Sequence, residues 1–195
     1  MNAKHMDGTY WENRWQQGQT SWDLGEASPP LKAYLDGVAD KHIAILIPGC
    51  GNAYEAAYLV ERGFTDVTLL DIAPTAVARL REQFGDRVNV HEADFFAWEG
   101  AYDLILEQTF FCALPPHQRP AYVRHVHHLL KPGGRLAGVL FDREFGTDGP
   151  PFGGSRAEYE TLFAPSFTTR VLAPCYNSAR PRQGTELFIS LEKPA

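Results

Sequence analysis

The sequence predicts an α/β fold with a doubly wound, mostly parallel sheet of seven strands that ends in an antiparallel pair. Short apolar, β-branched runs alternate with segments of helical periodicity, which is typical of a sheet covered by helices on both faces. The last two strand-like runs have no helix between them, and such neighbours are most simply antiparallel. With 195 residues, 44% of them hydrophobic, the chain suits one core, so we expect a single domain over residues 1–195.

The first strand-and-helix unit contains the expected central strand. The run 42–47 is apolar and rich in isoleucine, and Pro48-Gly49 closes it, which predicts a strand buried on both faces. Residues 52–63 place apolar side chains at helical spacing before Gly63, and glycine commonly follows the last turn of a helix. A strand, a glycine loop and a helix therefore follow one another.

The remaining elements repeat this pattern. A second strand over 66–71 precedes a helix that begins at Pro74, a residue favoured in a helix's first turn. Strands are also expected at 87–91, 102–106 and 135–141, with a helix over about 117–130 and a missing or short helix after the third strand. The flanking elements are a helix from Pro29 to about Val38, a helix over 155–163, and strands at 167–172 and 186–191.

In such sheets ligands bind at the carboxyl ends of the strands. The segments that the predicted strands bring to this edge are 48–53, 71–74, 93–97, 107–116 and 142–154. Candidate functional residues are therefore sought in these five segments.

Composition argues against several partners. The net charge of −6 disfavours nucleic acid, because that affinity comes largely from Lys and Arg. No apolar stretch approaches the roughly 20 residues that span a bilayer, and residues 1–18 lack a signal peptide's apolar centre. Three widely spaced cysteines suit neither a disulfide framework nor a zinc site. We expect a cytoplasmic monomer with free thiols, no metal, and no nucleic-acid or membrane partner.

The loop after the first strand indicates an adenosine-containing cofactor. Gly49 and Gly51 allow a ligand to approach the backbone, and Asp71 ends the second strand, where its carboxylate can accept bonds from both ribose hydroxyls. A dinucleotide motif would have a third glycine where Tyr54 stands. This favours S-adenosylmethionine over NAD, although a turn with an unrelated surface Asp remains an alternative.

Two further groups of residues extend this site. Asp94 and Phe95 follow the third strand and suit an adenine amino group and ring, although Asp94 equally suits a turn cap and Phe95 the core. Trp11 and Trp15 share one helix face and Trp22 follows, which predicts that residues 1–27 form a lid excluding water. The alternative is hydrophobic anchoring of this segment to the sheet.

Several motifs together resemble the thiopurine methyltransferase family, and most nearly its plant and bacterial halide/thiol (thiocyanate) methyltransferases. The resemblance covers nearly the whole chain from Trp11 and rests on Trp11-x-x-x-Trp15 with Trp22, Ile47-Pro-Gly-Cys-Gly51, Asp71-Ile-Ala, Glu107-Gln-Thr-Phe-Phe-Cys-Ala113, Arg119, Leu130-Lys-Pro-Gly-Gly134 and Gly149-Pro-Pro-Phe152. It implies methylation of small soft nucleophiles: a thiol, a thiopurine, thiocyanate, hydrosulfide or a halide.

The resemblance also implies site residues. Positions that contact S-adenosylmethionine in the family are matched by Trp11, Trp15, Trp22, Gly49, Asp71, Asp94 and Gln108. We expect Gly51, Phe95 and Glu107 to complete the cofactor site, and Phe111 and Phe152 to line the acceptor site. Gln108 departs from the halide/thiol branch, in which the resemblance implies an Asp-Tyr pair at this position. Phe152 stands where plant members have a tyrosine.

The chemistry of methyl transfer needs little catalytic machinery. An in-line displacement requires alignment and exclusion of water, and a nearby cation favours the thiolate form of a thiol. Arg119 is the candidate cation, and the alternative for it is a solvated arginine at a helix start. Asp142 and Arg143 end the fifth strand at the same edge, where either can tune the acceptor, and the alternative is that they simply pair with each other. A nicotinamide-dependent oxidoreductase and a non-catalytic S-adenosylmethionine sensor are the alternative functions.

Overall fold

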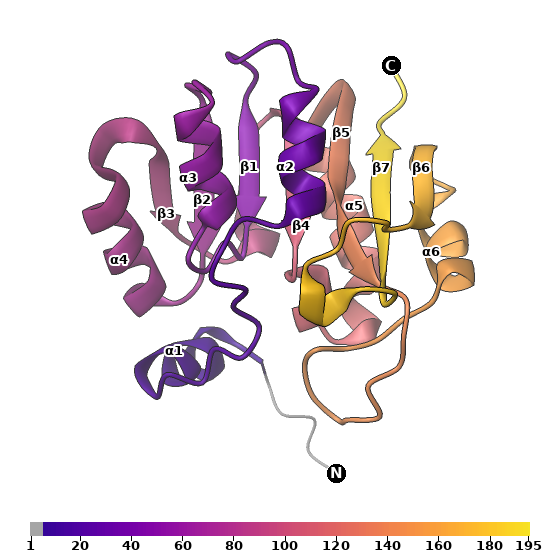
Figure 1. Ribbon diagram of the computed structural model, residues 1–195, viewed down its shortest axis with the longest axis horizontal. Helices are drawn as coiled ribbons and strands as arrows, with labels where there is room; N and C mark the ends of the chain where they lie inside the picture. Colours follow the sequence, from indigo (N-terminus) through magenta and orange to yellow (C-terminus); the bar gives the residue numbers. More distant parts are fainter. Residues whose placement is uncertain (1–5) are drawn as a thin grey trace.

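The computed structural model describes residues 6–195, so the first five residues of the expected lid and domain lie outside the described part. Seven strands form one sheet in the order β3-β2-β1-β4-β5-β7-β6 (Figure 1). The strands are β1 (Ile45–Pro48), β2 (Val67–Asp71), β3 (Asn89–Glu92), β4 (Tyr102–Gln108), β5 (Leu130–Phe141), β6 (Thr168–Pro174) and β7 (Glu186–Glu192). The α-helices are α1 (Gly8–Gln16), α2 (Pro29–Asp36), α3 (Tyr54–Glu61), α4 (Pro74–Phe84), α5 (Arg119–Leu129) and α6 (Arg156–Phe163).

The strand directions confirm the predicted fold class. Strands β3, β2, β1, β4 and β5 are mutually parallel, and β7 runs antiparallel between β5 and β6. Since β6 is antiparallel to β7, it runs in the direction of the parallel strands. The β6–β7 connection therefore lies at the same edge of the sheet as the glycine loop after β1.

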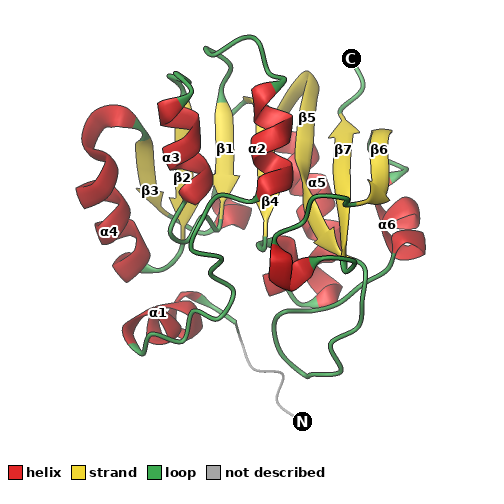
Figure 2. Ribbon diagram, in the orientation of Figure 1, coloured by secondary structure: helices red, strands yellow, loops and turns green. Residues whose placement is uncertain are grey.

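Helices cover both faces of the sheet, and the side chains of β1 show why. Helices α2, α3 and α4 lie on one face, and α5 and α6 lie on the other (Figure 2). Ile45 and Ile47 pack beneath the first group with Leu59 and Leu80, whereas Leu46 packs beneath the second. This alternation is the two-residue period of a strand buried on both sides.

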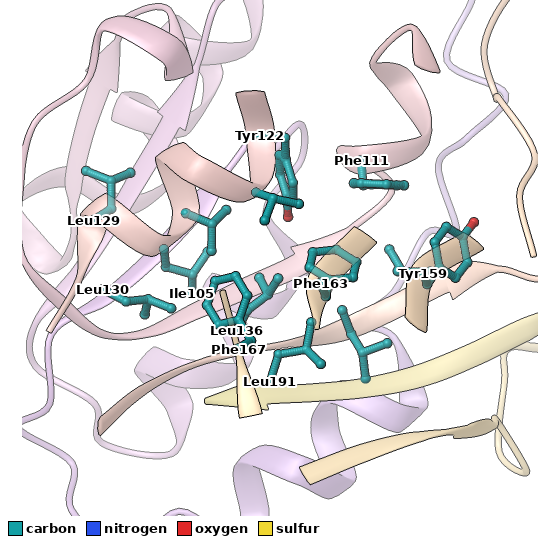
Figure 3. Close-up of a cluster of buried hydrophobic side chains, with 14 of the residues drawn as sticks. Ile105, Phe111, Tyr122, Leu129, Leu130, Leu136, Tyr159, Phe163, Phe167 and Leu191 are labelled. Atoms are coloured by element: carbon teal, nitrogen blue, oxygen red, sulfur yellow. The ribbon is translucent and has the colours of Figure 1, made fainter. Parts of the chain in front are cut away.

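An aromatic core lies beneath α5 and α6 (Figure 3). Tyr122, Phe111, Tyr159 and Phe163 are each at most 2% exposed. The Phe111 ring meets Tyr122 and Tyr159 edge-on, with centroids 5.1 and 5.7 Å apart, a favourable geometry for aromatic pairs. This core fixes the start of α5 against the loop after β4.

The boundaries of several elements differ from those predicted. The first strand begins at Ile45 because the Ala44 amide donates to the Asp103 side chain at 2.8 Å. β5 begins at Leu130, five residues earlier than expected, because Leu130 already pairs with Tyr102 across a register shift. The missing or short helix after the third strand is a single 3-10 turn over Phe95–Ala97.

Candidate active site

One cavity of about 660 Å³ opens at the carboxyl edge of the parallel strands. Its size lies within the range of small-molecule sites, which is roughly 300 to 1,000 Å³. The N-terminal segment closes it from beyond the strand ends, where Figure 1 shows α1. The predicted cofactor residues that line it are Trp11, Trp15, Trp22, Gly49, Gly51, Asp71, Asp94 and Phe95.

The Asp71 carboxylate holds the glycine loop in place. It accepts one hydrogen bond from the Gly51 amide and another from the Ala73 amide, both at 2.9 Å. Gly49 and Gly51 each have a φ of 55°, a conformation that favours glycine. Burial raises the pKa of Asp71 and the two amide donors oppose the rise, so the loop itself helps to keep the carboxylate charged.

Aromatic side chains cover both loop glycines. A Cβ on Gly49 would collide with the Phe110 ring, so this glycine is required by packing as well as by its φ. A Cβ on Gly51 would lie 3.6 Å from Trp15 and 4.0 Å from Trp22. The glycines therefore admit rings close to the backbone, with Phe110 on one side and the tryptophans on the other.

Residues Asp94 and Phe95, after β3, line the cavity and also have the structural roles of turn cap and core residue. Asp94 lines the cavity, and its carboxylate also caps the following turn by accepting from the Phe96 amide at 2.9 Å. Phe95 is 4% exposed and packs edge-on against Phe110, yet it also contributes to the cavity wall. Its adenine contact stays a prediction.

The N-terminal segment is fixed by both polar and apolar contacts. Trp15 is 5% exposed and packs with Ala73 and Ala76 at the start of α4. The Glu12 carboxylate accepts from the Thr75 amide at 2.9 Å and from the Thr75 hydroxyl at 2.5 Å, so α1 caps α4 from outside. These contacts anchor the segment while Trp11 and Trp22 line the cavity.

A turn after β4 separates two neighbouring phenylalanines. Thr109 has a φ of 60°, and the Glu107 carboxylate, fully buried, accepts from the amides of Phe110 and Phe111, each at 2.8 Å. The turn directs Phe110 to the cavity and Phe111 into the core. Phe110 therefore stands where the sequence placed Phe111, which does not line the cavity.

Gln108 lies beside the glycine loop, in a smaller hollow of about 50 Å³ that Gly49, Gly51 and Trp22 also line. Its side-chain oxygen is buried and has no hydrogen-bond partner in the described chain. An unpaired buried acceptor is costly unless a ligand donates to it. The ammonium group of S-adenosylmethionine is such a donor, so this position fits the predicted cofactor.

Besides Glu107, Gln108 and Phe111, three further predicted residues lie outside the cavity wall. Arg119 is 3% exposed, forms a 2.5 Å ion pair with Glu158 and donates to the Gly153 carbonyl at 2.6 Å. The Asp142 carboxylate accepts from the Arg156 amide at 3.1 Å, at the start of α6. The Phe152 amide donates to the Cys112 carbonyl at 2.7 Å. These contacts tie loops together rather than facing the cavity.

Three arginines of the described chain line the cavity, and the sequence reasoning missed two of them, Arg14 and Arg182. Arg143 follows β5, and Arg182 lies in the β6–β7 connection. Arg182 donates to the Trp22 carbonyl at 2.8 Å and lies 3.4 Å from Glu186. The predicted antiparallel pair of final strands already implied that the connection between them lies at the carboxyl edge of the parallel strands. The sequence therefore contained a signal that could have identified Arg182.

Burial raises the pKa of the Cys50 and Cys112 thiols and so disfavours a thiolate at either. All three cysteines are free, and the pKa of Cys112 rises to about 12. Within residues 6–195, no group of three or more His, Cys, Asp or Glu side chains is placed to hold a metal ion. No helix in that same range has the length and apolar character needed to cross a membrane.

The buried Glu107 predicts how the free energy of unfolding depends on pH. Burial raises its pKa from 4.5 to about 7 in the folded chain, so between these values the native state binds more protons than the unfolded state and loses stability as pH rises. Glu107→Gln cannot ionise, and its stability relative to wild type should increase across this window by up to about 3 kcal/mol. Urea unfolding at a series of pH values measures this difference.

The exposed Glu61→Gln is the matched control, because it makes the same substitution at the surface. A constant difference for Glu107→Gln, or one that shrinks as pH rises, would contradict the assignment of the raised pKa to Glu107.

The sequence is similar to one protein family over most of its length. The model of the family described as thiopurine S-methyltransferase matches residues 6–186. A probable thiol methyltransferase 2 from Arabidopsis thaliana is 35% identical, with 90% of this chain and 81% of the relative covered. Thiopurine S-methyltransferase from Vibrio vulnificus (strain YJ016) is 28% identical over 93% of this chain and 94% of the relative.

Solved structures share the fold. The 1,6-didemethyltoxoflavin-N1-methyltransferase of Burkholderia thailandensis, crystallised with S-adenosylhomocysteine, has a TM-score of 0.76 at 22% identity, covering 96% of this chain and 87% of that one. Magnesium protoporphyrin IX methyltransferase from Synechocystis PCC 6803 also reaches 0.76, at 14% identity, covering 96% and 99%. The chain therefore belongs to the thiopurine S-methyltransferase family, and it is an S-adenosylmethionine-dependent methyltransferase that acts on a small nucleophile.

Proposed function

We propose that the acceptor is a soft anion, either a thiolate or a small ion such as hydrosulfide, thiocyanate or a halide. The observation that carries this proposal is the distribution of charge along the cavity. Its acidic lining residues are Asp7, Asp23, Asp71 and Asp94, which come, together with Arg14, from the N-terminal segment and the ends of β2 and β3. At the other end, the charged lining residues are Arg143 and Arg182.

The acceptor end is mostly apolar. Besides Cys112, Gln118 and Thr185, its wall includes Leu114, Phe141, Phe145, Pro150, Pro151 and Pro181. The Arg182 guanidinium lies over the Phe141 ring, 5.4 Å from its centroid, and that of Arg143 lies 4.7 Å from the centroid of Phe145. An apolar wall with nearby cations suits a large, weakly hydrated anion better than a hard, strongly hydrated one.

A thiol of the protein itself indicates what the Arg182 cation does to sulfur. Cys112 lines the same cavity; burial and the nearby Glu107 carboxylate raise the pKa of its thiol, and the positive charge of Arg182 acts in the opposite direction. A free thiol has a pKa of about 8.5. Arg182 would lower the pKa of a bound acceptor thiol in the same way, which increases the fraction present as thiolate at neutral pH.

The residues need only hold and align the reactants. Bound S-adenosylmethionine supplies an activated methyl group. Asp71 and Asp94 would hold its nucleoside, and the lid tryptophans with Phe110 would exclude water from the space above the glycine loop. With the acceptor already anionic, transfer needs no general base and no covalent bond to the enzyme. The arginines would fix the acceptor at the opposite end of the cavity.

We also propose the organisation of the whole chain. A single domain over residues 1–195, with residues 1–27 as its lid, is supported by the one cavity wall that the N-terminal segment shares with the strand ends. A monomer in the cytoplasm, without a nucleic-acid or membrane partner, is supported by the net charge of −6 and by the free thiols.

Labelled methyl transfer tests the proposed acceptor class. Thiophenol, iodide, thiocyanate and hydrosulfide should each be offered with methyl-labelled S-adenosylmethionine, and phenol serves as the oxygen counterpart of thiophenol. Transfer to at least one soft acceptor, with none above background to phenol, is expected. An enzyme that binds the cofactor but methylates phenol or amines in preference to every soft acceptor would refute the proposal.

Arg182 gives a second test. The pH dependence of kcat with a thiol acceptor reports ionisation in the bound complex. In Arg182→Gln the acid limb should move to higher pH by about one unit, because an opposite charge nearby favours the thiolate. Arg180→Gln is the control, since Arg180 is exposed in the same turn and does not line the cavity. Equal pH profiles for both variants would remove Arg182 from this role.

Glu12 tests the lid. Glu12→Ala removes the external cap on α4, and a cap contributes about 1 kcal/mol, so the affinity for S-adenosylhomocysteine should fall about fivefold. Tryptophan fluorescence titration measures the affinity, with the exposed Glu61→Ala as control. A lowered melting temperature with unchanged affinity would show that the segment anchors the fold and does not act as a lid.

A further inference from the structure

Arg14 has a charge that no described carboxylate neutralises. It lies in α1, between Trp11 and Trp15 in sequence, and its side chain lines the cavity. None of the ion pairs within residues 6–195 involves Arg14. Its Nη1 donates to the Tyr10 hydroxyl at 3.1 Å, and its Nε is buried without a partner. The guanidinium therefore keeps donors and a full charge to offer a ligand.

Two aromatic rings hold this guanidinium on the cavity side of the lid. Its Cζ lies 5.4 Å from the centroid of Tyr10 and 5.7 Å from that of Trp22. Both contacts are cation–π interactions, which favour one orientation without neutralising the charge. Trp22 in turn approaches the space above Gly51. Arg14 is therefore part of the same aromatic cluster that covers the glycine loop.

The other two arginines of the cavity lining, Arg143 and Arg182, belong to the proposed acceptor end and do not come from the N-terminal segment. Arg182 lies 3.4 Å from Glu186 and donates to the Trp22 carbonyl. Arg143 stacks on Phe145 at the acceptor end. Arg14 is thus the one arginine of the cavity lining that the lid helix supplies.

The cofactor has one anionic group that this position suits. With the ribose at Asp71 and the adenine at Asp94, the amino-acid end must extend over the glycine loop toward Gly51, beneath Trp15 and Trp22. That end is a zwitterion. The buried, unpaired side-chain oxygen of Gln108 beside the loop suits its ammonium group, which leaves the carboxylate without a partner on the sheet side.

We propose that Arg14 binds the α-carboxylate of S-adenosylmethionine. The inference rests on the cofactor and goes beyond the acceptor proposal, which is independent of it. Arginine donors suit a carboxylate, and hydrogen bonds between charged groups are roughly twice as strong as neutral ones. The N-terminal segment thereby contacts the amino-acid end of the cofactor directly, and the carboxylate helps to hold this segment over the cavity.

Ligand pairs test this without any turnover. Calorimetry should compare S-adenosylhomocysteine with its decarboxylated counterpart, which lacks only the carboxylate. Wild type should prefer the carboxylated ligand by at least about tenfold, the effect of one charged hydrogen bond. In Arg14→Gln this preference should fall to nearly one, and Arg14→Lys should restore part of it.

Arg79→Gln is the matched control. Arg79 also stacks on a lid tryptophan, with its Cζ 5.5 Å from the Trp15 centroid, but it does not line the cavity. This variant should keep the wild-type preference. Equal weakening of both ligands in Arg14→Gln, or a wild type with no preference, would overturn the proposal. If wild type bound neither ligand, the cofactor site itself would be wrong. Failure of the methyl-transfer assay with soft acceptors would leave the ligand preference measured here unaffected.

Discussion

The carboxylate of Asp71 is the contact on which the carboxyl edge of the sheet depends. Its two oxygens accept from the amides of Gly51 and Ala73, so it joins the loop after β1 to the start of α4. Trp15 packs on Ala73, and Glu12 caps the helix that begins beside it. A single buried carboxylate thereby fixes the glycine loop, the start of α4 and the N-terminal segment that packs on it. Its desolvation is offset by the amides that it orders.

Glu107 organises the other half of the site in a similar way. The hydrogen bonds that it accepts from Phe110 and Phe111 stabilise a turn at Thr109 whose positive φ would otherwise be unfavourable. That turn places Phe110 over Gly49, between the loop and the acceptor end. The place of Phe110 in the cavity wall thus depends on a second buried carboxylate, two strands away from Asp71 in the sheet.

Sequence periodicity was sufficient for the fold and for bringing the glycine loop and Asp71 to one edge of the sheet. Buried parallel strands are continuous apolar runs, and Gly49, Gly51 and Asp71 are adjacent to such runs, so their place at the strand ends follows from local pattern. The opposite end of the cavity was harder to predict. It depends on the direction in which side chains point and on segments that are distant in the sequence. Phe110 and Phe111 are equivalent in sequence until the φ of Thr109 separates them. Arg119 follows the right strand but turns into the core, whereas Arg182 arrives from the other end of the chain.

The central claim is that the glycine loop and the N-terminal segment form one cofactor site. Hydrogen exchange with and without S-adenosylhomocysteine tests it directly. The ligand should slow amide exchange in residues 8–16 and 49–54 together, and leave the edge strand β6 unchanged. Protection of the glycine loop with no change in residues 8–16 would show that the tryptophan segment only anchors the fold, and would contradict this account of the site.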